Sequence, residues 1–281
     1  MKRLRIEHQT GFRYDDTVTA SYNEARMLPG TTDSQFVLAA AIDILPNAQV
    51  GSYVDYFGTR VSSFDVFTPH TELVITSRSL VEVRSRPADG AVLGFDRLAT
   101  EAERTVETIE QLAQTERTTP PEEVAELAKE LASRADSATA AALTIAETLT
   151  DAVTCDGCQA GVHTAPDEVW ATKRGTCRDV THLAIGALRS VGIPARYVSG
   201  YAHPRAGTDV GVALEAGSHA WLEWFTGEWR GFDVSERELT SDGHVRVGHG
   251  RDYSDVPPLR GVYAGPSSSE LHVKVTITRE A

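Results

Sequence analysis

Three residues whose side chains can carry out nucleophilic catalysis occur in separate segments of the chain, in the order cysteine, histidine, aspartate. The cysteine is Cys177 in the run RGTCRD, the histidine is His219 in SHAW, and the aspartate is Asp233 in GFD. A cysteine attacks a carbonyl as its thiolate, and a histidine oriented by a carboxylate is the usual group that takes the thiol proton. The three residues therefore predict a cysteine-dependent acyl-transfer enzyme.

The segment that begins at the cysteine has the pattern of an amphipathic helix over residues 177–191. Its apolar residues recur at the spacing of one buried helical face, and they are Val180, Leu183, Ala184, Ala187, Leu188 and Val191. The positive end of the helix dipole favours a thiolate, and the backbone amide of Cys177 is a candidate oxyanion donor. Gly175 permits an unusual backbone angle and a close approach by substrate. The alternative is that Cys177 is only a small buried hydrophobe.

The histidine and the aspartate are predicted on one β-hairpin, with strands over 219–225 and 229–234. Asp233 lies in an apolar stretch, where a carboxylate requires a partner, and a histidine on the adjacent strand provides one. Taken alone, His219 could also be a strand histidine that hydrogen-bonds locally, and Asp233 could be a turn residue that caps the next segment. The prediction of an enzyme therefore depends on the ordered set of all three residues. Trp221 is close enough to His219 in the sequence to form a wall of a substrate site, although tryptophans in a hairpin more often belong to the hydrophobic core.

The remaining elements divide the chain into a β-rich first part and a mixed second part. Residues 1–85 contain short alternating runs separated by turns, which favour a small sandwich or barrel-like module. The strands expected are 4–8, 35–45, a hairpin over 53–66, 71–83, 195–201 and 271–278. The helices expected are 95–113, one that starts at 119–123 with Thr119 as its cap, 137–150 and 166–172, and a glycine-rich mobile loop is expected over 203–217.

Composition restricts the partners and the compartment. The 281-residue chain carries a formal net charge of −13, whereas nucleic acids and anionic membranes favour basic surfaces, so neither is an expected partner. The first residues lack a long apolar run, so neither a signal peptide nor a spanning helix is expected. Three cysteines do not suggest a disulfide scaffold, which favours a reducing cytoplasm that would also keep Cys177 reduced. The oligomeric state has no sequence signal.

The runs around the three residues, with GIPARYVSGY at 192–201 and the segment 244–263, resemble the bacterial transglutaminase-like superfamily. Residues 1–85 resemble the N-terminal module that precedes the core of many members. The resemblance implies an α+β chain with this β-sandwich-like module followed by a papain-like core over 86–281, which begins with a helical lead-in over 86–153.

The resemblance also implies the roles of the three residues. Cys177 would be the nucleophile, His219 the base and later the acid, and Asp233 the orienting carboxylate of a triad. The substrate would be a peptide or another amide, and neither calcium nor another metal or cofactor is implied.

Two positions depart from many relatives, which carry Gln where this chain has Arg178 and Pro where it has Val234. The positive charge of Arg178 beside the nucleophile would stabilise the thiolate or bind an acidic group of the substrate, and a solvent-facing arginine is the alternative. The second oxyanion donor stays open, because nothing in the sequence places the N–H of Trp170 in the site.

The other cysteines and histidines carry weaker signals. Cys155 and Cys158 form a single CxxC, which is half of a zinc site. They are interpreted as incidental thiols, with a labile disulfide or a metal site as the alternative. The remaining histidines near the candidate residues are interpreted as core or loop side chains rather than second bases or ligands, and they are His182, His203, His244 and His249.

Three functions are compatible with the sequence. The first is hydrolysis of an amide or peptide through an acyl-enzyme thioester, and the second is transfer of the same acyl group to an amine. These two use the same three residues and differ only in the acceptor, which depends on how the site excludes water. The third is a non-enzymatic binding module, and the intact set of three residues argues against it.

Overall fold

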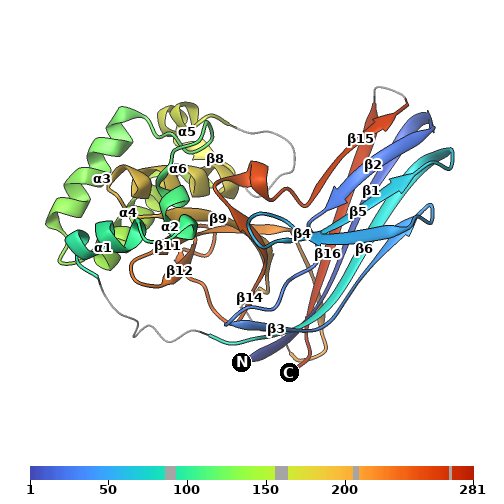
Figure 1. The fold of residues 1–281 in the computed structure, drawn as a ribbon, viewed down its shortest axis with the longest axis horizontal. Coiled ribbons are helices and arrows are strands. Elements are labelled where there is room, and N and C mark those ends of the chain that lie inside the picture. Colours follow the sequence, from blue (N-terminus) through green and yellow to red (C-terminus); the bar gives the residue numbers. More distant parts are fainter. Residues whose placement is uncertain (86–92, 156–163, 205–208, 266–267) are drawn as a thin grey trace.

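The computed structural model describes residues 1–85, 93–155, 164–204, 209–265 and 268–281. A group of helices, a central sheet and a β-sandwich follow one another across the molecule, and the two termini lie close together at one end of the sandwich (Figure 1). The predicted α+β class is confirmed. None of the described helices has the length and apolar composition needed to cross a bilayer.

Two sheets form the sandwich. The first contains, in spatial order, β10 (Ala213–Ala216), β16 (Ser269–Arg279), β1 (Lys2–Val18), β6 (His70–Val83) and β3 (Gln35–Leu45). The second contains β15 (Leu259–Ala264), β2 (Ala20–Ala25), β5 (Arg60–Val66) and β4 (Val50–Val54). Leu73 and Ile75 of the first sheet pack with Phe64 and Val66 of the second in one buried cluster, so the predicted β-sandwich-like module is confirmed.

The sandwich is completed by strands from the C-terminal part of the chain, which corrects the expected division into 1–85 and 86–281. β16 pairs with β1 over almost its whole length, and β15 pairs with β2. Residues 259–281 therefore belong to the sandwich. β1 is 17 residues long, and without β16 it would present a long unpaired edge. This long-range pairing leaves no local signal in the sequence.

The loop expected over 203–217 is also wrong in part. Its second half forms β10, which pairs with β16 through Ala213↔Thr278 to Ala216↔Val275. Residues 205–208 lie outside the described part of the chain.

The central sheet carries the predicted hairpin. Its strands, in spatial order, are β13 (Glu238–Leu239), β12 (Trp229–Asp233), β11 (His219–Phe225), β9 (Ala195–Ala202) and β14 (His244–Gly250). β11 and β12 pair from Phe225↔Trp229 to Leu222↔Phe232, so the hairpin is confirmed.

Strand β9 contacts both the helices and the sandwich. Tyr197 stacks on His182 of helix α6 (Cys177–Ser190), and Tyr201 packs edge-on against His8 of β1. Because side chains alternate along a strand, Tyr197 and Tyr201 lie on the same face of the sheet. The helix that begins with Cys177 and strand β1 of the sandwich therefore pack on the same face of the central sheet.

The other helices surround α6. They are α1 (Phe95–Ala102), α2 (Val106–Ile109), the 3₁₀ turn η1 (Glu110–Leu112), α3 (Glu122–Arg134), α4 (Ala138–Ala152) and α5 (Pro166–Thr172). The expected single helix over 95–113 is wrong, because the chain is extended at Thr105, whose side chain caps α2. The expected Thr119 cap is also wrong, since Pro121 occupies the N-cap of α3, where it offers no side-chain acceptor.

Substitution of Gly186 by alanine tests how tightly α6 is held. A Cβ there would lie 1.7 Å from the carbonyl oxygen of Thr118, so either the helix or the backbone before α3 must move. Although alanine favours helices, we expect Gly186→Ala to lower the free energy of unfolding by roughly 3 kcal/mol in urea titrations. Gly30→Ala, where a Cβ meets no atom within 4 Å, is the control. Equal stability of the two variants would contradict this packing.

Candidate active site

The structure brings His219 and Asp233 into direct contact. The Nε2 atom of His219, at the start of β11, lies 2.6 Å from Oδ2 of Asp233, at the end of β12. The side chain of Asp233 is fully buried and that of His219 is 14% exposed. A buried carboxylate at this distance orients the imidazole ring through Nε2. Nδ1 is then the ring nitrogen of His219 that does not face Asp233.

Four donors surround the carboxylate of Asp233. Oδ2 also faces Nε2 of His244 at 2.9 Å, and Oδ1 accepts hydrogen bonds from the backbone amides of Ser235 at 2.8 Å and Glu236 at 3.2 Å. Burial alone would raise the pKa of Asp233, but the hydrogen bonds from the two histidines hold it well below its usual range. The group is therefore an anion that cannot turn away from His219.

His244 is a site residue that the sequence interpretation missed. Its Nδ1 accepts a hydrogen bond from the amide of Ser241 at 3.1 Å, so its proton is on Nε2 and points at Asp233. His244 was expected in a loop, but it opens strand β14 opposite Ala202 of β9. The contact depends on the pairing of β14 with β9, so its only sequence signal is a histidine at the start of the alternating run HVRV.

His219, Asp233 and His244 also have the residue types of a metal site. Ligand atoms of His219, Asp233 and His244 lie within 4.8 Å of one another. However, both histidines direct Nε2 at one carboxylate oxygen, and the Nε2 of His244 carries a proton where a metal ligand needs a lone pair. The donor set therefore fits a hydrogen-bonded anion better than a cation site.

Cys177 is the first residue of α6 and is 2% exposed. Thr176 caps the helix, and the Asp179 carboxylate accepts hydrogen bonds in return from the amide and the hydroxyl of Thr176. Cys177 is disulfide-bonded, which corrects the expectation of a reduced thiol. Cys158 lies outside the described residues, and Cys155 is an exposed cysteine in no disulfide. A nucleophilic thiolate therefore requires reduction.

One cavity joins the start of α6 to His219. Thr176 and Arg178, on either side of Cys177, line the same cavity of about 180 Å³ as Ser218, His219 and Ala220 of the hairpin. The other walls come from β9, from the loop after β14, and from strands β1, β15 and β16 of the sandwich. The two neighbours of the candidate cysteine, the histidine and the sandwich therefore share one cleft.

Arg178 is partly buried, which argues against the solvent-facing alternative. Its guanidinium carbon lies 4.6 Å from the centre of the Tyr253 ring, in the 3₁₀ turn η2 (Tyr253–Asp255). The amide of Tyr253 donates to Nε2 of His182 at 3.1 Å, so His182 supports the wall of the cleft, as a core residue does.

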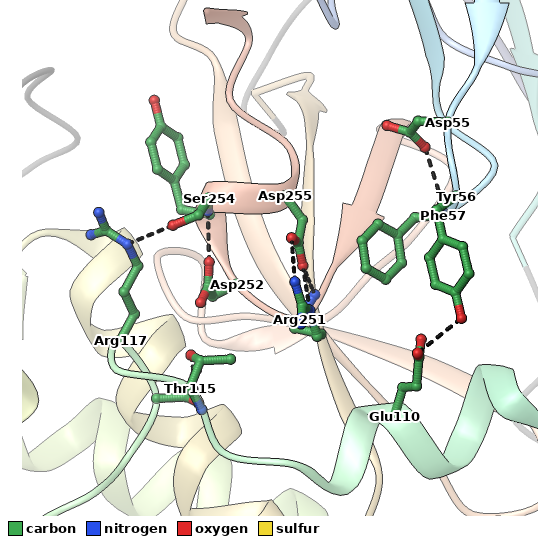
Figure 2. Close-up of polar contacts among 12 residues, drawn as sticks. Asp55, Tyr56, Phe57, Glu110, Thr115, Arg117, Arg251, Asp252, Ser254 and Asp255 are labelled. Atoms are coloured by element: carbon green, nitrogen blue, oxygen red, sulfur yellow. Dashed lines mark hydrogen bonds and ion pairs between the residues drawn. The ribbon is translucent and has the colours of Figure 1, made fainter.

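The loop that carries Tyr253 is held from several sides (Figure 2). Arg251 forms an ion pair with Asp255, and Asp252 caps η2 through the amide of Ser254. Arg117, before α3, donates to the hydroxyl of Ser254 at 2.9 Å. From inside, Arg189 of α6 donates to the carbonyl of Arg251 at 2.8 Å. Tyr253 is therefore a fixed part of the cleft.

The structure also places Gly175, Trp221 and Trp170. The φ angle of Gly175 is not positive, so the expected unusual backbone angle is wrong. A Cβ atom at Gly175 would lie 3.3 Å from side-chain atoms of Asp179 and Val169. Trp221 is buried and lines a separate cavity, with its ring edge-on to that of His244. The indole N–H of Trp170 donates to Glu123, so it is no oxyanion donor here.

Comparison with known proteins extends these observations. Residues 4–82 match the model of the bacterial transglutaminase-like N-terminal region, and residues 125–234 match that of the transglutaminase-like superfamily. An uncharacterized protein of Mycobacterium leprae is 37% identical over the full length of both chains. An uncharacterized protein of Mycobacterium tuberculosis is 33% identical over 98% of this chain and 92% of its own.

A crystal structure from Cytophaga hutchinsonii, named as a "Putative Cysteine Protease", has a similar fold. Its TM-score is 0.74, with 18% identity over 99% of this chain and 97% of that chain. Both the sandwich and the core therefore recur in a known structure.

The buried charge of Asp233 predicts a pH dependence of stability. A carboxylate whose pKa is lower in the folded state stabilises the fold above its unfolded pKa of about 4, and loses that contribution as pH falls. We expect the difference in unfolding free energy between wild type and Asp233→Asn to shrink below pH 4, by up to about 1.4 kcal/mol per pH unit. Urea titrations from pH 7 to 3 measure it. Asp151→Asn, an exposed carboxylate, is the control; a constant difference for Asp233→Asn would contradict the assignment.

Proposed function

Because the chain belongs to the transglutaminase-like superfamily and carries its bacterial N-terminal region, we propose that it is a cysteine-dependent hydrolase of amide or peptide bonds. The superfamily contains cysteine hydrolases and transferases with a papain-like core. Cys177 is the proposed nucleophile, His219 the general base and acid, and Asp233 the residue that orients His219.

One observation carries the proposal. His219 is bonded to a fully buried carboxylate at 2.6 Å, and it lines the same cavity as the two residues that flank Cys177. A purely structural histidine has no need to face a cleft beside a cysteine at a helix start. The arrangement supports the roles that general acid–base and nucleophilic catalysis require.

The first half of the reaction forms an acyl-enzyme. Nδ1 of His219 takes the thiol proton, the sulfur of Cys177 bonds to the carbonyl carbon, and the oxyanion faces the amide of Cys177. The other ring proton stays on Nε2, which donates a hydrogen bond to the Asp233 carboxylate, and this carboxylate stabilises the imidazolium. The C–N bond then breaks, and Nδ1 gives its proton to the leaving amine, so that a thioester remains.

The second half releases the acyl group. Nδ1 of His219 takes a proton from water, the hydroxyl oxygen bonds to the thioester carbon, and the C–S bond breaks. The products are a carboxylic acid and the cysteine, which with His219 forms the starting pair again. If an amine takes the place of water, the same steps yield a new amide, so acyl transfer is the alternative that the assay below distinguishes.

Charges near the start of α6 oppose one another. The helix dipole and the Arg178 guanidinium favour a thiolate at Cys177, whereas the buried carboxylate of Asp179 disfavours it. The imidazolium of His219 is then the decisive partner, since an ion pair stabilises a thiolate more than a helix end alone.

Substitution of the cysteine tests the proposal directly. After reduction with dithiothreitol, we expect wild type to cleave members of a panel of peptide, isopeptide and γ-glutamyl amides, with activity absent from the unreduced protein. Cys177→Ala should lower kcat/KM by at least about a thousandfold, while Cys155→Ala should leave it unchanged. Glycine ethyl ester, added as an amine acceptor, distinguishes acyl transfer from hydrolysis, because transfer yields the new amide and hydrolysis yields the carboxylic acid. Equal cleavage by Cys177→Ala would sink the proposal.

His244 is proposed as a positioning residue that acts through Asp233. Its replacement by phenylalanine removes one hydrogen bond from the carboxylate, so the pKa of Asp233 should rise and His219 should lose part of its orientation. We expect kcat to fall roughly ten- to hundredfold with KM nearly constant, and the acidic limb of the pH profile to move to higher pH. His249→Phe, on the same strand, is the control. A fall in KM and kcat together, without the pH change, would indicate only a structural role.

A further inference from the structure

One wall of the cleft beside His219 carries a buried tyrosine hydroxyl that bonds to no described residue. Tyr197 of β9 lines the same cavity as Thr176 and His219, and only 2% of its surface is exposed. Its hydroxyl makes no hydrogen bond within the described ranges of the chain. A buried tyrosine hydroxyl usually has a partner, so an unpaired one on the wall of a cavity points to a ligand.

The hydroxyl of Tyr197 opens on the cleft. Several polar side-chain atoms of the described residues are sealed from solvent without a partner, and the Tyr197 hydroxyl is not one of them. Because this hydroxyl has no partner either, the small surface left to Tyr197 includes its oxygen. The cavity that Tyr197 lines is the space into which that surface opens.

Tyr201, two residues further on the same face of β9, shows how a structural tyrosine differs. Its hydroxyl donates to the carbonyl of Met27 at 3.0 Å and lies 2.9 Å from Nδ1 of His8. These contacts join the central sheet to the sandwich, and Tyr201 is outside the cleft lining. Tyr197 has the same burial without such contacts, so packing alone does not account for its hydroxyl.

The ring of Tyr197 is held on two sides. It stacks on the ring of His182 with the centres 5.0 Å apart, and the ring of Tyr253 meets it edge-on at 6.2 Å. The amide of Tyr253 is in turn bonded to Nε2 of His182. A ring held in this way presents its hydroxyl at one position, which is the property that lets a donor stabilise a developing charge without reorganisation.

The stacking places Tyr197 beside the first turn of α6. His182 is four residues after Arg178, and helical side chains lean toward the N-terminus, so the His182 ring lies over the turn that contains Arg178. The charges that act on the phenol include those of Arg178 and Asp179, the two residues that follow Cys177. The phenol is therefore at the end of the helix that begins with Cys177.

The phenol keeps its proton at neutral and mildly alkaline pH. Burial raises the pKa of Tyr197 well above its usual value. The Arg178 cation opposes this rise, whereas Tyr253 and the carboxylates of Asp179 and Asp252 add to it. Tyr197 is therefore a neutral hydrogen-bond donor.

We infer that the hydroxyl of Tyr197 is the second oxyanion donor of the site. It donates a hydrogen bond to the oxygen that becomes negative when the sulfur of Cys177 bonds to a carbonyl carbon, and the backbone amide of Cys177 donates to the same oxygen. The inference rests on the proposed role of Cys177 as the nucleophile. Since this contact forms fully only in the transition state, loss of the hydroxyl slows the chemical step rather than substrate binding.

Ser199 is the other hydroxyl of β9 in the cleft lining. It is 8% exposed and lies opposite Ala220 of β11. Its hydroxyl turns about a single bond and has no ring to hold it. A clamped donor stabilises an oxyanion better than a rotating one, which favours Tyr197, and Ser199→Ala tests this choice.

Two reagents that attack the same sulfur through different transition states test the inference without knowledge of the substrate. The thiolate attacks the carbonyl carbon of p-nitrophenyl acetate, an oxyanion forms, p-nitrophenolate leaves, and a thioester remains on Cys177. With iodoacetamide the sulfur bonds to the CH₂ group, iodide leaves, and no oxyanion forms. The ratio of the two rates cancels any change in the thiolate fraction of Cys177.

The reduced full-length protein is treated with each reagent. The initial release of p-nitrophenolate, less that from Cys177→Ala, gives the acetylation rate, and peptide mass spectrometry gives the alkylation rates of Cys177 and Cys155. We expect Tyr197→Phe, which keeps the ring, to lower the acetylation rate at least about tenfold and to leave the alkylation rate of Cys177 within about twofold.

Tyr201→Phe is the matched control, since it removes a hydroxyl from the same face of the same strand. Because that hydroxyl is bonded, Tyr201→Phe should lower the urea midpoint of unfolding and leave the ratio of the two rates unchanged. Tyr197→Phe loses no hydrogen bond to a described residue, so its urea midpoint should equal that of wild type. This comparison also shows whether Tyr197→Phe has folded.

The outcomes separate the two proposals. If wild-type Cys177 reacts no faster than Cys155 with iodoacetamide, the proposed nucleophile fails and the inference fails with it. If Cys177 reacts fast but Tyr197→Phe has the wild-type ratio, only the inference is overturned. A parallel fall of both rates in Tyr197→Phe, or a larger loss of acetylation in Ser199→Ala, would also overturn it.

An amide substrate from the panel gives a second measurement. We expect Tyr197→Phe to lower kcat roughly a hundredfold with KM nearly constant, because the oxyanion is absent from the bound ground state. A raised KM with unchanged kcat would assign the hydroxyl to substrate binding instead, and would overturn its role as an oxyanion donor.

Discussion

The buried negative charge of Asp233 is the constraint on which the candidate site depends. A carboxylate without solvent is costly unless every lone pair is met, and here two imidazoles and two backbone amides meet them. Each donor comes from a different part of the central sheet or from the turn after β12. The sheet must therefore pair in one register for the charge to be tolerated, and that register also fixes the ring of His219.

The same sheet brings the two parts of the molecule together. Strand β9 packs on α6 through Tyr197 and on the sandwich through Tyr201, so the helix that begins with Cys177 and strand β1 lie beside each other. The last strand, β16, pairs with the first strand, β1, so the C-terminal end of the chain lies beside its N-terminal end. The sandwich is thereby a wall of the cleft as well as a neighbour of the core.

The environment of Cys177 combines features that act in opposite directions. A helix end, an arginine and a histidine favour a thiolate, while the capping carboxylate of Asp179 disfavours it and a disulfide blocks it. In the proposed reaction, reduction of Cys177 is the first requirement, and the charge balance then sets its reactivity.

The sequence by itself determined the elements whose signals are local. The apolar repeat after Cys177 predicted α6, the alternating runs around the 226–228 turn predicted the hairpin, and the order of residue types predicted which histidine and aspartate would meet. The broken helix near Thr105 and the cap at Pro121 were missed because short helices and caps depend on details that packing overrides.

Tertiary structure alone decided the contacts between distant strands. His244 reaches Asp233 only because β14 pairs with β9, and Val273 lines the cleft only because β16 pairs with β1. Such pairings join residues far apart in the chain, and alternation on each strand is compatible with several partners. The contact of His219 with Asp233 was therefore predictable from residue types and spacing, whereas the second histidine and the walls of the cleft followed from the fold.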